Sequence, residues 1–335
     1  MKILLVPEPA APYGEDGFCR EFAARAAAHG HQIMNGTVPA GAPEEVLPRL
    51  LAGGFARDVD AVLINGYQAP AIRAARAAGT KCAVRLIESF AHVPESLMTP
   101  IRDSLRQADC LLVPSQYLAR LIHSWNGGIR TSLVPYAYDQ VRAHQIALTT
   151  MRASRPADFQ IATTCRFTEA CRPGMEMLLA AASRLRFAWH LVVIGDGPIL
   201  PALRERARQF FPEHQVDFTG GLPHLKVMEI FRSAKAYVDP TGLEGFPAMA
   251  LCSLAEGCPV VAPRAGAVCE LLSDGKNALL FEPGDPASLA QSLVKLSSVR
   301  GLSLQLISEG VATAHGQTWD ATVRAACTAL EELAR

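Results

Sequence analysis

The sequence predicts an α/β protein of two domains, each built on a doubly wound parallel sheet. The chain has 335 residues, which is more than one hydrophobic core usually holds, so two domains are the default. Half of the residues are apolar and 19% are charged, as in an ordinary globular protein. Short apolar runs typical of buried strands alternate with segments of helical periodicity, and short loops join them.

The amino-terminal domain is expected at residues 1–148. An apolar run at residues 2–6 ends at Pro7, which is typical of a buried parallel strand. Residues 17–29 place apolar side chains at helical spacing and stop at Gly30. Further strands are expected at residues 31–34, 61–65, 81–87, 110–113 and 131–135. Further helices are expected at residues 44–51, 69–78, 95–107 and 115–125.

The same alternation restarts after a weakly patterned stretch at residues 143–156, which we expect to be the linker. The second domain is therefore placed at residues 149–315, followed by a carboxyl-terminal segment at 316–335. Its strands are expected at residues 159–164, 190–194, 216–219, 236–239, 260–262 and 278–281. Its helices are expected at residues 174–186, 198–211, 222–234, 245–256, 268–272, 288–297 and 303–315, and a last helix at 321–333. Two such Rossmann-like domains facing each other leave a cleft at the carboxyl ends of both sheets, where ligands bind in this class.

Composition narrows the classes of partner and compartment. Lys and Arg together number 32, as do Asp and Glu, so no overall field favours nucleic acid or an anionic membrane. The first apolar run is too short for the core of a signal peptide, and no run approaches the roughly 20 residues of a membrane helix. The nine cysteines lie mostly in apolar segments, which is typical of reduced thiols. We expect a cytoplasmic protein without a nucleic-acid partner.

The tripeptide Glu244-Gly245-Phe246 lies where a predicted strand passes into a predicted helix. The Glu244 carboxylate would accept hydrogen bonds from sugar hydroxyls, and the N–H groups of Gly245 and Phe246 would point at the same ligand from the helix N-terminus. On the tripeptide alone, an acidic first-turn residue that complements the helix dipole is the more typical interpretation.

Two arginines follow the first strand of the second domain. Arg166 comes directly after the strand at residues 159–164, and a permanently charged, bidentate guanidinium there suits a phosphate or diphosphate. A solvated surface arginine is an equally typical interpretation of Arg166. Arg172 is a second candidate, more typical of a solvated side chain.

The Gly195-Asp-Gly-Pro198 turn does not indicate a dinucleotide site. The dinucleotide fingerprint needs a third glycine where Leu200 stands. We therefore predict a strand-to-helix turn with Pro198 at the start of the helix.

No motif indicates a catalytic nucleophile or a metal site. Gly-x-Ser-x-Gly is absent. The pairs Cys165/Cys171 and Cys252/Cys258 share a spacing that is wider than the usual spacing of zinc ligands. The nine histidines form neither H-x-x-x-H nor HExxH, so we predict no bound metal.

Taken together, the motifs of the second domain resemble the GT-B-fold glycosyltransferases of family 4, group 1, over nearly its whole length. The matching segments are Cys165-Arg-Phe-Thr-Glu-Ala-Cys-Arg-Pro, Leu191-Val-Val-Ile-Gly-Asp-Gly-Pro, Val216-Asp-Phe-Thr-Gly, Tyr237-Val-Asp-Pro-Thr, Glu244-Gly-Phe, Ala255-Glu-Gly-Cys-Pro-Val-Val-Ala, and Gly266-Ala-Val-Cys-Glu through Gly284-Asp. Trp319 matches a tryptophan before the last helix of this group. The amino-terminal domain matches more weakly, through Gly14 to Gly30-His31, Pro114-Ser115 and Val134-Pro135.

The resemblance implies a GT-B fold and transfer of a sugar from a UDP- or GDP-linked donor, with retention at the anomeric carbon and without a metal or other cofactor. The nucleotide would bind the second domain. The acceptor, which would be a sugar, a lipid-linked, a small-molecule or a protein acceptor, would bind the first. Basic side chains and backbone dipoles would neutralise the leaving diphosphate. The segment at residues 316–335 would pack back toward the first domain, and any membrane contact would be weak and peripheral.

The resemblance also assigns site residues. Arg166 matches the phosphate arginine and Glu244 the acidic residue near the donor sugar, so both are expected to be catalytic. Residues expected to bind the donor are Gly14, Arg172, Gly195, Gly245, Phe246, Pro247 and Cys252. Residues expected on the acceptor side are Glu88, Ser89 and His92.

Two departures from the family pattern keep other functions open. Cys171 stands where the family usually has a lysine, and Cys252 stands where a second glutamate usually holds the ribose. A thiol supplies no fixed positive charge and only weak hydrogen bonds, although Arg172 would compensate if it turned inward. A non-catalytic relative that binds a glycan or a partner subunit is the second hypothesis. The third is an epimerase or hydrolase that turns over the donor without an acceptor.

Overall fold

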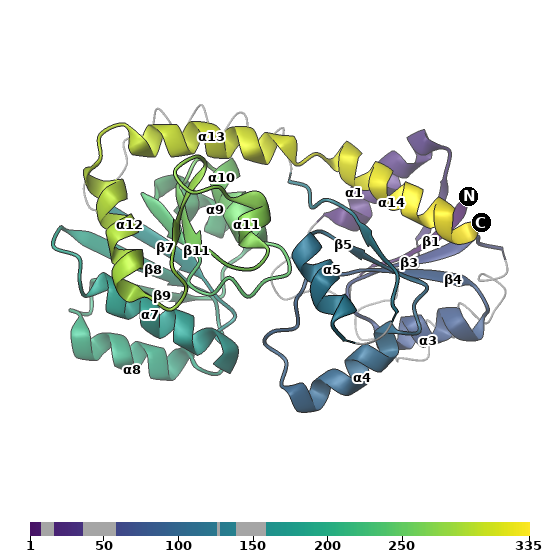
Figure 1. Cartoon of the computed structure of the whole chain (residues 1–335), viewed down its shortest axis with the longest axis horizontal. Helices are drawn as coiled ribbons and strands as arrows, with labels where there is room; N and C mark the ends of the chain where they lie inside the picture. Colours follow the sequence, from purple (N-terminus) through teal and green to yellow (C-terminus); the bar gives the residue numbers. More distant parts are fainter. Residues whose placement is uncertain (8–16, 36–57, 126–127, 139–158) are drawn as a thin grey trace. The chain divides into compact units, whose positions relative to one another are not determined.

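The structure, a computed structural model, describes residues 1–7, 17–35, 58–125, 128–138 and 159–335. It divides into two compact units (Figure 1). Unit 1 comprises Met1–Ala137 and Thr318–Arg335, and unit 2 comprises Tyr138–Gln317. The helix expected at residues 44–51 and the linker expected at residues 143–156 lie outside the described residues.

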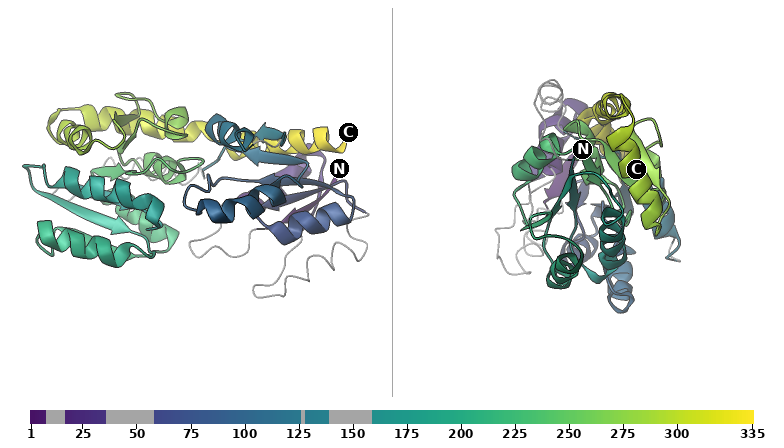
Figure 2. Two further views of the ribbon diagram at one scale, coloured as in Figure 1. Left: turned by 60° about the horizontal axis from the view of Figure 1, so that its bottom comes forward. Right: turned by 90° about the vertical axis from the view of Figure 1, so that its left-hand side faces the viewer.

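Unit 1 is built on a six-stranded parallel sheet in the order β2-β1-β3-β4-β5-β6. Its strands are β1 (Lys2–Val6), β2 (Gln32–Asn35), β3 (Ala61–Asn65), β4 (Lys81–Arg85), β5 (Cys110–Val113) and β6 (Thr131–Leu133). Its helices are α1 (Phe18–Ala26), α3 (Ala69–Ala77), α4 (Glu95–Leu105), α5 (Gln116–His123) and α14 (Trp319–Ala334), with a 3₁₀ turn η1 (Ala27–His29). The central strands are buried along nearly their whole length, because helices cover both faces of the sheet (Figure 2).

The last helix, α14, packs against α1 within unit 1. Trp319, Val323 and Leu330 of α14 share one buried cluster with Phe18 and Phe22 of α1. The final segment of the chain therefore completes the core of the unit that contains the first strand.

Unit 2 carries a second six-stranded parallel sheet in the order β12-β11-β10-β7-β8-β9. Its strands are β7 (Phe159–Thr164), β8 (Trp189–Ile194), β9 (Val216–Gly220), β10 (Ala236–Val238), β11 (Val260–Pro263) and β12 (Ala278–Phe281). Its helices are α7 (Arg172–Ala182), α8 (Leu200–Phe210), α9 (His224–Ser233), α10 (Ala248–Ala255), α11 (Val268–Leu271), α12 (Pro286–Ser298) and α13 (Leu302–Gly316), with a 3₁₀ turn η3 (Glu169–Cys171). The strand order reverses between β7 and β10, which is the point where doubly wound sheets bind their ligands.

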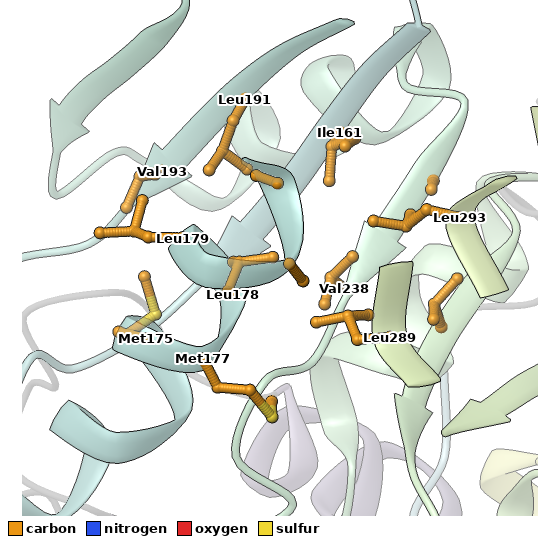
Figure 3. Packing of buried hydrophobic residues seen from close by; sticks show 14 of the residues in the cluster. Ile161, Met175, Met177, Leu178, Leu179, Leu191, Val193, Val238, Leu289 and Leu293 are labelled. Carbon is orange, nitrogen blue, oxygen red and sulfur yellow. The ribbon is translucent and has the colours of Figure 1, made fainter. Parts of the chain in front are cut away.

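The core of unit 2 holds α7 and α12 on one face of its sheet (Figure 3). Leu178 of α7 and Leu289 of α12 share a buried cluster with Ile161 of β7 and Val238 of β10. Side chains alternate along a strand, so the residue before Val238 faces the other side. This residue, Tyr237, packs there against Phe231 of α9, with 5.0 Å between the ring centroids. The shared cluster therefore holds α7 against β7 and β10 on one face, while α9 covers β10 on the other.

The strand-to-helix turn after β8 differs from the prediction at one position. Helix α8 begins at Leu200, and Pro201 occupies its first turn. Pro198 lies in the turn itself, so its placement at the helix start was wrong. A proline is tolerated in the first helical turn because no intrahelical bond is lost there, and Pro201 meets this condition.

Candidate functional site

The loop that carries Arg166 follows β7 and is held by two buried anchors. The N–H of Cys165 donates to the Ile194 carbonyl at 3.0 Å, which extends the pairing of β7 with β8 by one residue. Phe167 is fully buried and has φ 45°, a conformation that is uncommon for a bulky residue. The Phe167 carbonyl accepts from the N–H of Ile199 at 3.0 Å. The exposed Arg166 side chain is therefore presented by a backbone that is fixed on both sides.

The Gly195-Asp-Gly197 turn after β8 lies in direct contact with the Arg166 loop. A Cβ atom on Gly195, which has φ +130°, would lie 1.9 Å from the Cys165 carbonyl oxygen. A Cβ atom on Gly197 would lie 2.1 Å from the Arg166 carbonyl oxygen. The two glycines let the turn approach the Arg166 backbone more closely than any side chain would allow.

The loop that carries Glu244 follows β10 and is organised by the carboxylate of Asp239. This side chain is 8% exposed, and its Oδ1 accepts from the Thr241 N–H at 2.9 Å, the Thr241 hydroxyl at 3.2 Å and the Gly242 N–H at 3.1 Å. This is an Asx turn, and the order Asp-Pro-Thr-Gly in the sequence is a signal that would have found it. Sequence reasoning missed this role of Asp239.

Two close contacts fix the Glu244 loop against the rest of unit 2. A Cβ atom on Gly174 of α7 would lie 2.5 Å from the Pro240 carbonyl oxygen. A Cβ atom on Gly242, with φ +60°, would lie 2.7 Å from Cγ of Pro263. The loop is therefore held between α7 and the end of β11, and it presents the exposed Glu244 at the carboxyl edge of the sheet.

The start of α10 differs from the prediction. The helix begins at Ala248 with Pro247 as its N-cap, so Glu244 is not a first-turn residue and does not complement the dipole from that position. Gly245 and Phe246 are buried and precede the helix, and the Phe246 carbonyl accepts from the Ala248 N–H at 2.8 Å. Their N–H groups are loop amides, which corrects the expectation that they lie at the helix N-terminus.

Arg172 occupies the first position of α7 and is engaged in a bidentate ion pair. Its Nε and Nη2 atoms donate to the two carboxylate oxygens of Glu169, each at 2.8 Å. The hydrogen bonds to Arg172 lower the pKa of Glu169 below its usual value. Arg172 is therefore paired with a carboxylate of its own loop, and Arg166 is the other arginine that was expected near the diphosphate.

Cys252 lies inside α10 and is 5% exposed. Burial, assisted by the charge of Glu256, raises the pKa of its thiol to about 12. A carboxylate stands one helical turn later, at Glu256, which is the C-cap of α10. That side chain is 1% exposed and binds Nε of Arg232 at 2.6 Å and the Tyr138 hydroxyl at 2.9 Å. Sequence reasoning did not find this buried cluster, because Tyr138 lies far from Glu256 in the sequence.

Replacing Glu256 by glutamine is expected to lower the free energy of unfolding by about 2 kcal/mol, because a buried charge-assisted contact is lost while Arg232 stays partly exposed to water. Urea unfolding followed by circular dichroism measures this change. Glu229→Gln is the matched control, since Glu229 pairs with Lys226 at 2.8 Å on an exposed surface. The control is expected to change stability by less than about 0.5 kcal/mol, and equal effects of the two variants would contradict the prediction.

The residues expected on the acceptor side lie together in unit 1, directly after β4. Glu88 and His92 are each 31% exposed, with 4.0 Å between Oε2 and Nε2. Ser89 is 6% exposed, and its hydroxyl accepts from the Ala91 N–H at 3.3 Å. Phe90, which follows Ser89 in the chain, is buried and has a φ of 58°. Gly14, expected to contact the diphosphate, lies outside the described residues.

A buried arginine at the end of β4 was not singled out from the sequence. Arg85 is 5% exposed, and its Nη1 donates to Oδ1 of Asn65 at 2.9 Å. Its guanidinium also lies 4.1 Å from the ring centroid of Phe18, within the range of a cation–π interaction. The sequence signal that would have identified Arg85 is its position as a charged residue inside the apolar run at residues 81–87.

Within the described ranges, no group of three His, Cys, Asp or Glu side chains is arranged to hold a metal ion. None of the helices in that part of the chain has the length and apolar character required to cross a bilayer.

Comparison with known proteins finds a family model that matches most of the second unit. Residues 158–298 match the family model described as glycosyl transferases group 1. A D-inositol 3-phosphate glycosyltransferase of Acidothermus cellulolyticus is 33% identical over 145 residues, which are 42% of this chain and 32% of that protein. A sulfoquinovosyl transferase of Arabidopsis thaliana is 26% identical over 212 residues, 59% of this chain and 39% of that protein. The chain thus spans only about a third of the length of these relatives.

Solved structures resemble the chain over both units. HepE of Anabaena, solved in complex with UDP and glucose, has a TM-score of 0.75 at 16% identity and covers 99% of this chain and 100% of its own. Sucrose-phosphate synthase of Thermosynechococcus elongatus has a TM-score of 0.76 at 17% identity and covers 99% of both chains. These likenesses confirm the predicted two-domain α/β GT-B fold, and the family match confirms the resemblance to group 1 glycosyltransferases.

Proposed function

We propose, from the premise that residues 158–298 form a glycosyl transferases group 1 domain, that this protein transfers a sugar from a nucleotide diphosphate donor to an acceptor. The donor would be UDP- or GDP-linked. HepE was solved with UDP-glucose, which makes a UDP-linked sugar the first donor to test. The bond from the anomeric carbon to the diphosphate breaks, and an acceptor oxygen takes its place.

One observation carries the proposal. Arg166 and Glu244 follow β7 and β10, the two neighbouring strands between which the strand order of unit 2 reverses. Ligands of doubly wound sheets bind at such a reversal, outside the carboxyl ends of the strands. An arginine, which suits a diphosphate, and a carboxylate, which suits sugar hydroxyls, therefore lie on loops at one edge of the sheet, and this supports the proposal.

Each side chain has a distinct role in this proposal. The Arg166 guanidinium neutralises charge on the leaving diphosphate, where it develops during bond breaking. Glu244 accepts hydrogen bonds from donor sugar hydroxyls, beside the loop amides of Gly245 and Phe246. Retention at the anomeric carbon and independence of metal ions rest on the family resemblance. The same holds for an acceptor beside Glu88.

Isothermal titration of the full chain with UDP-, GDP- and ADP-linked glucose tests donor binding directly. We expect saturable binding of one nucleotide class and release of its nucleoside diphosphate when an acceptor is present. Nuclear magnetic resonance of the product would report the anomeric configuration, and chelator-treated protein would report the metal requirement. If the protein binds none of the three nucleotide sugars, the proposal is contradicted.

Replacing Glu244 by glutamine is expected to weaken binding of the nucleotide sugar by about tenfold, because a charged acceptor of sugar hydroxyl groups is lost. Binding of the nucleoside diphosphate alone is expected to stay within about twofold, since the missing contact is to the sugar. Calorimetry with both ligands measures the difference. Glu205→Gln on α8 is the control, because its side chain is 65% exposed and follows a different strand.

Two outcomes would redirect the proposal. Equal weakening of both ligands in Glu244→Gln would place Glu244 at the nucleotide instead of the sugar. Turnover of the donor at the same rate with and without acceptors would favour an epimerase or hydrolase.

A further inference from the structure

Two hydroxyl groups meet at the strand reversal of unit 2, and the proposed function gives neither of them a role. Thr164 is the last residue of β7, and Tyr237 is the middle residue of β10. The Thr164 Oγ1 atom lies 3.0 Å from the Tyr237 hydroxyl oxygen, which is a hydrogen bond. Thr164 is partly exposed, whereas Tyr237 is 3% exposed. Of the two residues, Thr164 is therefore the one that a ligand can reach.

The register of the sheet places both side chains on one face. Tyr237 of β10 lies opposite Ala162 of β7, and side chains two positions apart on a strand share a face. Thr164 therefore lies on the same face as Tyr237. The Tyr237 ring packs against Phe231 of α9, so this is the face that α9 covers.

The Tyr237 side chain is fixed, so its hydroxyl can orient that of Thr164. Burial raises the pKa of Tyr237 well above its usual value, and the hydroxyl therefore keeps its proton. A threonine hydroxyl offers one donor and two acceptor lone pairs. Whichever of the two oxygens donates, Thr164 keeps either its proton or a lone pair for a further hydrogen bond.

Both residues immediately precede the two loops of the proposed donor site. Arg166 follows Thr164 by two positions, and Asp239, which organises the Glu244 loop, follows Tyr237 by two positions. The strand order reverses between β7 and β10, and ligands of doubly wound sheets bind outside the carboxyl ends of such strands. The hydroxyl of Thr164, at the carboxyl end of β7, thus adds an uncharged donor and acceptor to a site that already has a cation and a carboxylate.

We propose that the Thr164 hydroxyl binds a hydroxyl group of the donor, and that Tyr237 is a positioning residue that orients it. The inference rests on the proposed function. A nucleotide diphosphate sugar offers hydroxyl groups on its ribose and on the sugar that it carries, and both are partners for an uncharged hydroxyl. One neutral hydrogen bond of this kind corresponds to about threefold to tenfold in affinity.

Thr164→Val tests the contact, because valine keeps the branched shape of the side chain and removes the hydroxyl. Calorimetry of the full chain uses UDP-glucose, UDP, 2′-deoxy-UDP and 3′-deoxy-UDP, together with the guanosine and adenosine counterparts. We expect Thr164→Val to weaken binding of the glucose donor by about fivefold to tenfold.

The smaller ligands identify which hydroxyl is bound. If the nucleoside diphosphate is weakened equally but one of its deoxy forms is not, the contact is to the ribose. If binding of the nucleoside diphosphate is unchanged, the contact is to the transferred sugar. Both results support the proposal, whereas an equal loss for every ligand, or no loss for any, would overturn it.

Tyr237→Phe removes only the second hydroxyl of the pair. It should weaken the same ligands as Thr164→Val by about threefold, and it should leave unchanged any ligand that lacks the contacted hydroxyl. A merely structural role of Tyr237 would not produce this selectivity. The double variant should bind like Thr164→Val alone, because Tyr237 acts through Thr164. Additive losses would overturn the positioning role.

Thr163→Val is the matched control. Thr163 precedes Thr164 on β7, so its side chain lies on the other face of the sheet, and it is fully buried. Its hydroxyl has no hydrogen-bond partner among the residues that the structure describes. Its replacement should leave binding of every ligand within about twofold, and urea unfolding of each variant shows whether the fold persists. A loss as large as that of Thr164→Val would show that either replacement disturbs β7, and would overturn the proposal.

Failure of this inference is distinguishable from failure of the proposed function. If the parent chain binds none of these ligands, the proposed function fails and the inference fails with it. If the parent chain binds them and Thr164→Val binds them as tightly, the inference alone fails.

Discussion

Replacing Arg166 by alanine is expected to lower the rate of sugar transfer by about 10²–10³-fold, the usual cost of losing one charged group that stabilises a developing anion. Arg166 is exposed and stands on a loop whose neighbours are fixed by Phe167 and Gly197. Its loss removes charge without removing the anchors, so the fold should persist. The initial rate of nucleoside diphosphate release from the donor, with circular dichroism of both proteins, measures the effect.

Arg172→Ala is the matched control for this experiment. Arg172 lies six residues further along, but its guanidinium is held by both carboxylate oxygens of Glu169. Its removal is expected to change the transfer rate by no more than about threefold, as for other surface ion pairs. A larger loss in Arg172→Ala than in Arg166→Ala would show that Arg172 leaves Glu169 and supplies the charge that Cys171 lacks.

Replacing Gly195 by alanine is expected to lower the free energy of unfolding by about 3–4 kcal/mol. A left-handed φ of +130° strains any side chain by about 1–3 kcal/mol. The new methyl would also lie 1.9 Å from the Cys165 carbonyl oxygen, and Cys165 is held in place because its N–H donates to the Ile194 carbonyl of β8. Urea unfolding followed by tryptophan fluorescence measures the change, because Trp189 lies in the core of unit 2.

Gly275→Ala is the control that separates the cost of backbone strain at a positive φ from the cost of the steric collision at Gly195. Gly275 has φ +71° and nothing within 4 Å of its would-be Cβ atom, so its replacement should cost only about 1–2 kcal/mol from backbone strain. If the two variants lose equal stability, the close approach of the β8 turn to the Arg166 loop contributes nothing.

The alternation of strands and helices was predictable because each strand of a covered parallel sheet is a continuous apolar run. Once the alternation is known, Arg166 and Glu244 fall after strands without further information. What the sequence did not reveal is contact between segments distant along the chain. A Cβ atom at Gly195 would collide with Cys165, which lies 30 positions earlier in the chain. A short stretch of sequence around either residue does not indicate this contact.

Two other features that the sequence analysis did not predict have causes close by in the sequence. The engagement of Arg172 by Glu169 was visible as an oppositely charged pair three residues apart, a spacing at which side chains on a helical turn meet. The late start of α10 follows from Pro247, which serves as the N-cap and leaves Glu244 to Phe246 in the loop. A helical pattern alone does not fix such a boundary.

The docking of α14 onto α1 has a consequence for the order in which the chain folds during synthesis. Unit 1 begins with Met1 but is completed by Thr318–Arg335, while unit 2 is one uninterrupted segment between the two parts. The chain emerges at about 5–20 residues per second, so roughly 10–40 s separate Ala137 from α14. During that interval the faces of Phe18 and Phe22 that meet Trp319 and Leu330 lack their cover. Unit 2 is therefore synthesised in full before unit 1 is complete. Unit 1, although its synthesis begins first, depends longest on protection from aggregation.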